Sequence, residues 1–262
     1  MRTLAIYGAY FAQFLKARMA YRADFFAEIF ATALGSAASL AFVFVLFVPI
    51  DAIGGWSRDE ILFVYGMSMI PYGLFATISW NLFDFGDRFI IEGHFDRVLL
   101  RPVNSFAQVV FEAFRIQTLT EAAIGVVVVT TAARRLDLDL GVADVLWMIV
   151  AVASGCAIFI AVFGTVASLS FHFEDRVGIA PPIFNLINAG RYPVDLFPAA
   201  VRFVLRWIIP FAFVAFYPSA LPLRKAELRE FCMASPLIAV VFLGVLAFAW
   251  RRGVRAYQST GS

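Results

Sequence analysis

Residues 145–171 have the sequence VLWMIVAVASGCAIFIAVFGTVASLSF, an apolar run without a charged side chain. A helix needs about 20 predominantly apolar residues to cross the hydrocarbon layer of a membrane, which is roughly 30 Å thick. Backbone groups inside lipid must form hydrogen bonds within their own segment, and a helix meets this requirement. The run therefore predicts a membrane-spanning helix, and it decides the fold class of the chain.

Other parts of the chain share this apolar character. Of the 262 residues, 62% are hydrophobic and 15% are charged, whereas soluble domains have about 45–50% apolar and about 25% charged residues. We therefore expect an all-α integral membrane protein that forms a single transmembrane domain over residues 1–262. Apolar runs predict six spans, at residues 29–50, 61–83, 106–133, 145–171, 177–192 and 233–250.

Two segments depart from the simple spanning pattern. Residues 1–24 place Leu4 and Phe11 on one helical face and carry Lys16 and Arg18, which predicts an amphipathic helix on the membrane surface. The alternative is that these residues lengthen the first span. Residues 194–217 combine prolines with arginines, and irregular backbone at membrane depth needs a protein cover or a cavity. We therefore expect two short re-entrant helices between the fifth and sixth spans.

The basic residues predict the orientation of the chain, because cytoplasmic loops carry an excess of Lys and Arg. With both termini in the cytoplasm, the inside segments hold twelve basic residues and the outside segments nine. Six of those nine lie in 191–229, so the balance is twelve to three once this re-entrant region is set aside. The distribution favours cytoplasmic termini on that condition.

Residues 84–104, between the second and third spans, alternate charged and large apolar side chains. A short amphipathic helix of this kind can place its apolar face in a groove on a partner protein. Gly93 is expected to divide the segment, and Pro102 is expected to open the next helix. The alternative is a helix that lies on lipid headgroups.

Three motifs, in this order, resemble the ABC-2 type permeases and cover nearly the whole chain. They are MAYRADF at 19–25, GHFDRVLLRPV at 93–103, and RYPVDLFP at 191–198 with IPFA at 209–212 and YP at 217–218. The resemblance is to the small six-span branch, long described as uncharacterised transport components. It implies the cell membrane as location and one half of an exporter. A second permease subunit, identical or homologous, and two copies of a cytoplasmic ATPase would complete it.

The resemblance also assigns roles to residues. In such permeases the loop after the second span docks on the ATPase, and the re-entrant helices lie on the outer face. The coupling residues would be Gly93, Phe95, Asp96, Arg97, Leu100, Arg101 and Pro102. The outer gate would comprise Arg191, Tyr192, Pro193, Asp195, Pro198, Arg202, Arg206 and Pro210. From the residues alone, the charged members could form an internal ion network, or the arginines could extend to the interface.

The chain contains no nucleotide-binding loop of the P-loop type. Such a loop needs a Gly-rich backbone followed by a Lys, and the two lysines, Lys16 and Lys225, follow Phe14-Leu15 and Leu223-Arg224. ATP and Mg²⁺ are therefore expected on the partner ATPase, and this chain is expected to be a transport subunit and not an enzyme. The net charge of +2 gives no indication of nucleic-acid binding.

Glu121 is the ionisable residue farthest from a predicted span end. Such residues are costly in lipid and mark transport paths or buried pairs, so Glu121 could contact a cationic substrate or bond to another helix. An ion-driven transporter that uses Glu121 is the alternative function. An intramembrane enzyme is a third option, but His94 and His172 lie in polar loops.

Glu112 and Arg115 are three positions apart and could form an ion pair on one helix face. No metal site is predicted.

Overall fold

The computed structural model describes residues 22–173, 180–225, 228 and 230–258. Five helical stretches within these residues are long and apolar enough to cross a membrane, and a bent pair of short helices gives a sixth if it is counted as one span. The five contain α2 (Arg22–Leu46), α3 (Arg58–Ser79), α6 (Leu119–Arg135), α7 (Val142–Leu169) and α11 (Ser235–Ala256). The expected helical membrane fold is therefore observed, with five or six spans.

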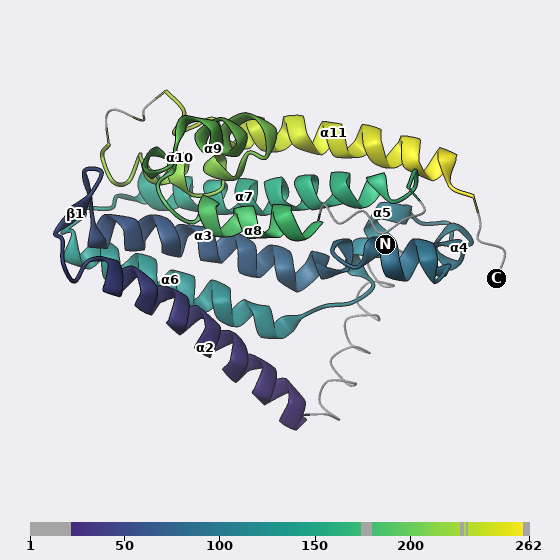
Figure 1. The fold of residues 1–262 in the computed structure, drawn as a ribbon, viewed down its shortest axis with the longest axis horizontal. Helices are drawn as coiled ribbons and strands as arrows, with labels where there is room; N and C mark the ends of the chain where they lie inside the picture. The colour runs from purple at the N-terminus through teal and green to yellow at the C-terminus, as the bar shows by residue number, and fades with distance from the viewer. Residues whose placement is uncertain (1–21, 174–179, 226–227, 229, 259–262) are drawn as a thin grey trace.

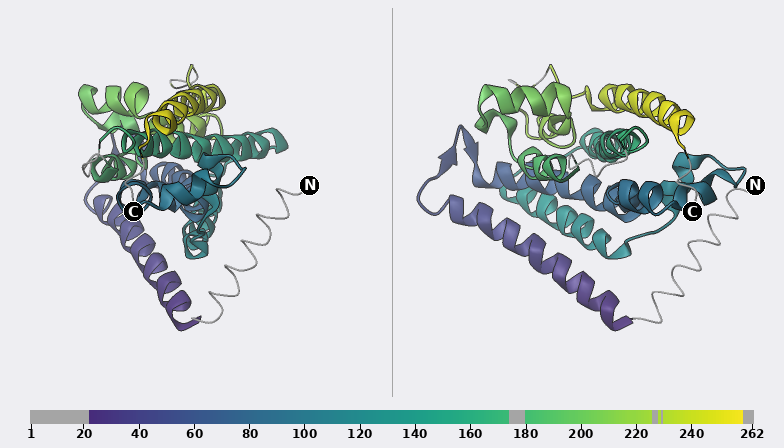
Figure 2. Two further views of the ribbon diagram at one scale, coloured as in Figure 1. Left: turned by 90° about the vertical axis from the view of Figure 1, so that its right-hand side faces the viewer. Right: turned by 45° about the vertical axis from the view of Figure 1, so that its right-hand side comes forward.

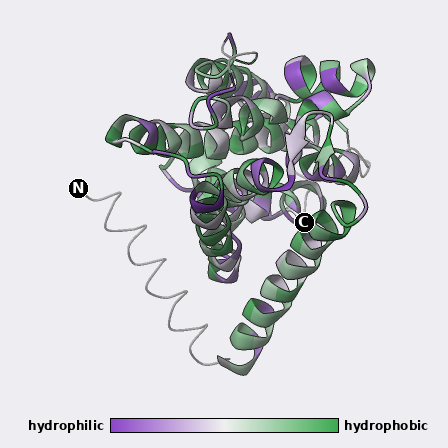
Figure 3. Ribbon diagram, turned by 90° about the vertical axis from the view of Figure 1, so that its left-hand side faces the viewer, coloured by the Kyte–Doolittle hydropathy of each residue, from purple (hydrophilic) through white to green (hydrophobic). Residues whose placement is uncertain are grey.

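The long helices lie roughly side by side in the order α11, α7, α3, α6 and α2 (Figure 1). In the apolar stretch of the span that contains α3, 83% of the residues are buried, against 11% in that of α2. Helix α3 therefore forms the centre of the bundle and α2 an edge. Towards its N-terminal end α2 separates from the other helices (Figure 2). Hydrophobic residues follow α2 along most of its length (Figure 3), as expected for a helix that faces lipid.

The start of α3 is fixed by a hairpin and a capping box. Strands β1 (Ala52–Ile53) and β2 (Trp56–Ser57) pair antiparallel, and Gly54 and Gly55 make the turn at φ of 56° and 82°. The Ser57 hydroxyl accepts a hydrogen bond from the Glu60 amide at 3.3 Å, and the Glu60 carboxylate accepts one from the Ser57 amide at 2.8 Å. This reciprocal pair satisfies free amides of the first turn.

Glycines allow α3 and α6 to approach closely. A Cβ on Gly73 would lie 2.7 Å from the backbone nitrogen of Ala122, and one on Gly125 would lie 2.9 Å from the carbonyl oxygen of Gly66. Small residues at such crossings are typical of membrane helix pairs, because association in lipid depends on close packing. The α3–α6 pair therefore forms the tight centre of the bundle.

Gly73→Ala is expected to destabilise the chain by about 1–3 kcal/mol, because the added methyl group forces α3 and α6 apart. Gly35 on α2 is the matched control, since nothing lies within 4 Å of a Cβ there. Gly35→Ala should be neutral or stabilising by up to about 1 kcal/mol, because Ala favours helix more than Gly. The two melting temperatures in detergent, measured on the purified chain, check this difference. Equal melting temperatures would contradict the close approach.

The predicted third span, 106–133, is wrong in its first half. A short helix, α5 (Ser105–Phe111), ends before a non-helical stretch, and a 3₁₀ turn, η3 (Ile116–Thr118), precedes α6. The unwound residues include Glu112 and Arg115, whose charges are costly inside a lipid-facing helix. The prediction that Pro102 opens the next helix is also wrong, because α5 begins at Ser105 with the Asn104 side chain as its cap.

The region between α7 and α11 is made of short pieces. Within the described residues, α8 (Ala180–Gly190) is shorter than a span, and the first residues of the predicted span 177–192 lie outside them. The pieces that follow are η4 (Val194–Leu196), α9 (Ala199–Phe203), η5 (Val204–Ile208), η6 (Phe211–Phe213) and α10 (Phe216–Ser219). The stretches Ala199–Ile208 and Phe211–Ser219 meet at 74°, at Pro210, which lacks an amide donor. The predicted surface helix at 1–24 falls almost entirely outside the described residues.

Candidate functional site

The 84–104 segment forms one end of the molecule, opposite the β hairpin (Figure 1). It folds as a π-helix, η2 (Phe85–Ile91), and a short helix, α4 (His94–Leu99). Gly93 lies between them at φ 71°, a left-handed conformation that favours glycine. The division expected at Gly93 is therefore confirmed, and it sets the angle between the two pieces.

An aromatic cluster anchors α4 to the bundle. Phe95 is fully buried, and its ring centre lies 4.9 Å from that of Phe171 at the end of α7 and 5.0 Å from that of Tyr257. Trp250 of α11 packs on Phe95 as well, at 6.1 Å. The Tyr257 hydroxyl donates a hydrogen bond to Asp96 Oδ1 at 3.0 Å. The inner face of α4 is thus fixed to the ends of both α7 and α11.

The outer face of the same segment is apolar and unusually exposed. Leu100 is 83% exposed, and Leu99 and Ile91 are 46% and 45% exposed. Arg97, Arg101 and Pro102 are also exposed. The structure therefore divides the sequence-predicted coupling residues into two groups. Phe95 and Asp96 hold the segment in place, whereas Leu100, Arg97, Arg101 and Pro102 face outwards.

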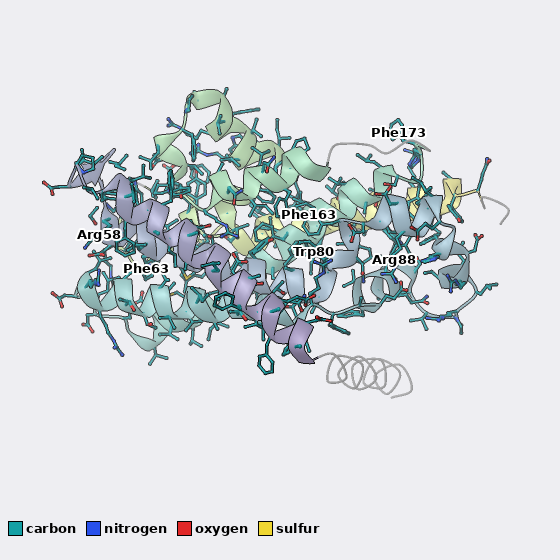
Figure 4. The ribbon with its side chains drawn as sticks, turned by 60° about the horizontal axis from the view of Figure 1, so that its bottom comes forward. Arg58, Phe63, Trp80, Arg88, Phe163 and Phe173 are labelled. Atoms are coloured by element: carbon teal, nitrogen blue, oxygen red, sulfur yellow. The ribbon has the colours of Figure 1, made fainter. Side chains whose placement is uncertain are left out.

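Arg88 connects this end to the unwound stretch after α5. It donates to Glu112 at 3.1 Å and to Asn81 at 3.4 Å, and it lies far from Arg58, at the other end of the molecule (Figure 4). The Arg115 guanidinium lies 4.0 Å from the Trp80 ring centre. Glu112 therefore binds Arg88, and the expected pairing of Glu112 with Arg115 on one helix face is wrong because the chain between them is not helical.

A second cluster lies inside the bundle and joins two residues that the sequence treats separately. Arg191 donates to Glu121 Oε1 at 2.7 Å and to the Tyr65 hydroxyl at 3.3 Å. Its guanidinium also lies 5.0 Å from the Tyr72 ring centre. Arg191 and Glu121 are 7% and 9% exposed. A buried ion pair with an aromatic wall therefore ties the chain after α8 to α3 and α6.

The remaining gate residues occupy other positions. Arg206 lies 4.9 Å from the Phe231 ring centre and 5.3 Å from that of Tyr217, and Arg202 donates to the Phe197 carbonyl at 3.3 Å. Tyr192 packs on Tyr65 at 5.6 Å. The structure buries Pro193 and Pro210 and exposes Asp195 and Pro198. Arg191 is therefore held by Glu121, whereas Arg206 lies against two aromatic rings and Arg202 bonds to a backbone carbonyl.

A family model described as ABC-2 family transporter protein matches residues 33–261. The chain belongs to this family. No curated protein and no solved structure matches it. Membership makes the chain an ABC-2 permease, a multi-pass membrane transport protein that works with a cytoplasmic ABC ATPase and has no ATPase site of its own.

Several residues of the permease sites gave no signal in the sequence. Tyr65 and Tyr72 are ordinary aromatic residues of an apolar run, and Tyr257 lies seven residues beyond the predicted last span. Only their contacts with Arg191 and Asp96 distinguish them. In the part of the chain that the structure describes, no three His, Cys, Asp or Glu side chains come together as metal ligands do.

Tyr257→Phe is expected to loosen α4 of the permease by about 1 kcal/mol, the value of one hydrogen bond. Burial and the neighbouring Asp96 carboxylate raise the pKa of the Tyr257 phenol to about 12. A raised pKa means that the hydrogen bond is fully present below the ordinary value of about 10 and is lost only as the pH rises through about 12. Amide hydrogen exchange of residues 94–100 should therefore be faster in the variant, by the same factor at pH 6 and pH 9 once corrected for intrinsic rates.

Ser39→Ala is the control for this measurement, because the Ser39 hydroxyl only donates to the Gly35 carbonyl of its own helix. It should leave exchange at 94–100 unchanged. Unchanged exchange in Tyr257→Phe would contradict the anchoring role of Tyr257.

Proposed function

We propose that this permease is the membrane subunit of an ABC exporter in the cell membrane, with both termini in the cytoplasm. In this proposal, two permease subunits, identical or homologous, form the translocation path. A cytoplasmic ATPase dimer that binds ATP and Mg²⁺ drives them. The observation that carries the proposal is the outer face of 91–102, a solvent-exposed apolar surface on a firmly anchored support.

The chemistry of this outer face fits a protein partner. An apolar residue that is 83% exposed is costly in water and gains when a partner groove covers it. Arg97 and Arg101 beside it can form charge-assisted hydrogen bonds with acidic residues at the rim of such a groove. The end of α11 lies at this same end of the molecule and carries Arg251, Arg252 and Arg255. An excess of basic residues supports a cytoplasmic location.

Movement of the ATPase can reach the far end of the permease through α11. Its cytoplasmic end bears Trp250, which donates to the Ser105 hydroxyl at 3.0 Å. At its other end, Ser235 donates to the carbonyl of Phe213 in the bent region at 2.7 Å. A docked ATPase that has two states can favour two arrangements of such a rigid connection. We infer that the region around 191–217 acts as the outer gate.

The contacts of Glu121 support an internal role over an ion-driven mechanism. An ion-driven transporter needs a carboxylate that binds and releases its ion during the cycle, whereas Glu121 is held by Arg191 at 2.7 Å. The same pair can break when the gate moves, and Glu121 would then face the path. Contact of Glu121 with substrate is therefore a second step of the proposal, limited to the open state.

Purification from the native membrane in mild detergent tests the proposed function. A soluble P-loop protein is expected to co-purify at about one copy per permease subunit. Its ATPase activity should respond to reconstitution with the permease in lipid. Recovery of the permease alone, or only with copies of itself, would count against the exporter assignment.

A further inference from the structure

An apolar groove opens between α2, α3 and α6, away from both sites described above. Leu40 and Phe44 of α2, Leu62 of α3, and Val127 and Val128 of α6 provide most of its walls. Its volume is about 120 Å³, well below the several hundred Å³ of a pocket for a drug-sized ligand. The groove therefore suits a narrow apolar chain better than a bulky molecule.

The mouth of the groove lies at the level where the three helices meet the membrane surface. α2 ends at Leu46, α3 begins at Arg58, and α6 ends at Arg135. Val127 and Arg135 are eight residues apart on α6, so the groove descends about 12 Å from this level. A molecule that fills it would extend from the headgroup region into the hydrocarbon layer.

Charged side chains gather at the mouth of the groove and directly beside it. Arg58 Nε lies 3.5 Å and Arg135 Nη1 3.6 Å from the same oxygen of Asp59, so two guanidinium groups share one carboxylate. Both arginine side chains remain partly exposed, at 43% and 49%. Arg58 also lies over Phe44, a wall residue, at 5.6 Å from the ring centre. Asp51 lines the adjoining hollow together with Arg58, so the two arginines are balanced by two aspartates. The partly exposed guanidinium groups still offer hydrogen-bond donors beside an apolar slot.

From this arrangement we propose that the groove binds one glycerophospholipid through its phosphate and one acyl chain. The phosphate lies between Arg58 and Arg135, and one acyl chain fills the slot between α2 and α6. Guanidinium groups bind phosphate oxygens through paired hydrogen bonds, and the apolar walls match an acyl chain. The lipid would fill the space between α2, the least buried of the spans, and the central pair. This site is independent of the proposed export function.

Native mass spectrometry of the full chain in mild detergent, with phosphatidylglycerol added, tests the proposal. One tightly held lipid is expected per chain. The double variant Arg58→Gln/Arg135→Gln should weaken it about tenfold, the effect of losing a charged hydrogen-bond partner. Val127→Phe, which fills the slot from an exposed position, should weaken it to a similar extent. Melting temperatures confirm that each variant is folded.

Two neighbouring substitutions serve as matched controls. Arg134→Gln removes the same kind of charge from an exposed residue outside the groove, and Val126→Phe adds the same ring to an exposed position that does not line it. Neither should change lipid affinity. Equal lipid retention in all variants would show only a general lipid coat and overturn the site. Loss of a dimer in Val127→Phe, without loss of lipid, would overturn it by assigning the groove to a second copy.

Discussion

Glu121→Gln should lower the free energy of unfolding of the permease by about 3 kcal/mol. The substitution keeps the size of the side chain but leaves the guanidinium of Arg191 buried without its counter-charge. Tyr65 and Tyr72 contribute a hydroxyl and a ring face, which do not replace a carboxylate. Reversible unfolding in mixed detergent micelles measures the effect on the purified chain.

Arg191→Met should be less damaging than Glu121→Gln. The carboxyl group left behind can take up a proton and become neutral, whereas a guanidinium remains charged under all ordinary conditions. The double variant Glu121→Gln/Arg191→Met removes both charges and should be more stable than Glu121→Gln alone. The two single variants and the double variant form a double-mutant cycle. Changes in unfolding free energy that are strongly non-additive in this cycle indicate a direct interaction between Glu121 and Arg191.

The pair between Arg88 and Glu112 provides the control for this cycle. Its side chains are 37% and 36% exposed, and Arg88 Nη2 lies 3.1 Å from Glu112 Oε1. Glu112→Gln should therefore change stability by less than about 1 kcal/mol. Additive single effects at Glu121 and Arg191, no larger than this control, would refute the buried pair.

The sequence predicts the long uncharged spans closely because lipid imposes one strong and local requirement. The run 145–171 corresponds to α7 (Val142–Leu169). The run 233–250 begins two residues before α11 (Ser235–Ala256) and ends inside it. The predicted span 106–133 is wrong in its first half, because a run that is apolar on average contains the non-helical stretch around Glu112. There Glu112 bonds to Arg88, 24 positions away, a contact that no local pattern contains.

The candidate sites show the same limit. The motif around Gly93 predicted a divided amphipathic segment, and the φ of 71° agrees. Amphipathic spacing does not distinguish Phe95 from Leu100, because both are large apolar residues. Only the structure shows that Phe95 packs on Phe171 and Tyr257 while Leu100 is exposed. The sequence marks Glu121 as a charge inside a span and Arg191 as part of the RYPVDLFP motif. Their pairing depends on how α6 and the chain after α8 pack, which is a property of the tertiary structure.

Leu100→Asp combined with Arg97→Glu should weaken binding of the ATPase by at least about tenfold, because a central apolar anchor and a rim charge are both lost. Both side chains are exposed, so the melting temperature of the permease should stay unchanged. Asp96 is avoided, because its bond to Tyr257 at 3.0 Å makes it part of the support. Co-purification of the ATPase with the variant, compared with wild type at equal permease level, measures the effect.

A control at the opposite end of the molecule separates docking from a general effect of charge. Val142 is 78% exposed at the start of α7, and Arg134, eight positions earlier at the end of α6, is also exposed. Val142→Asp combined with Arg134→Glu makes the same chemical change, and the ATPase should still co-purify. If both double variants lose the ATPase equally, the loss reflects altered membrane insertion or surface charge. If neither loses it, the outer face of 91–102 is not the docking surface. The proposed transmission of ATPase movement through α4 to α11 would then be contradicted as well.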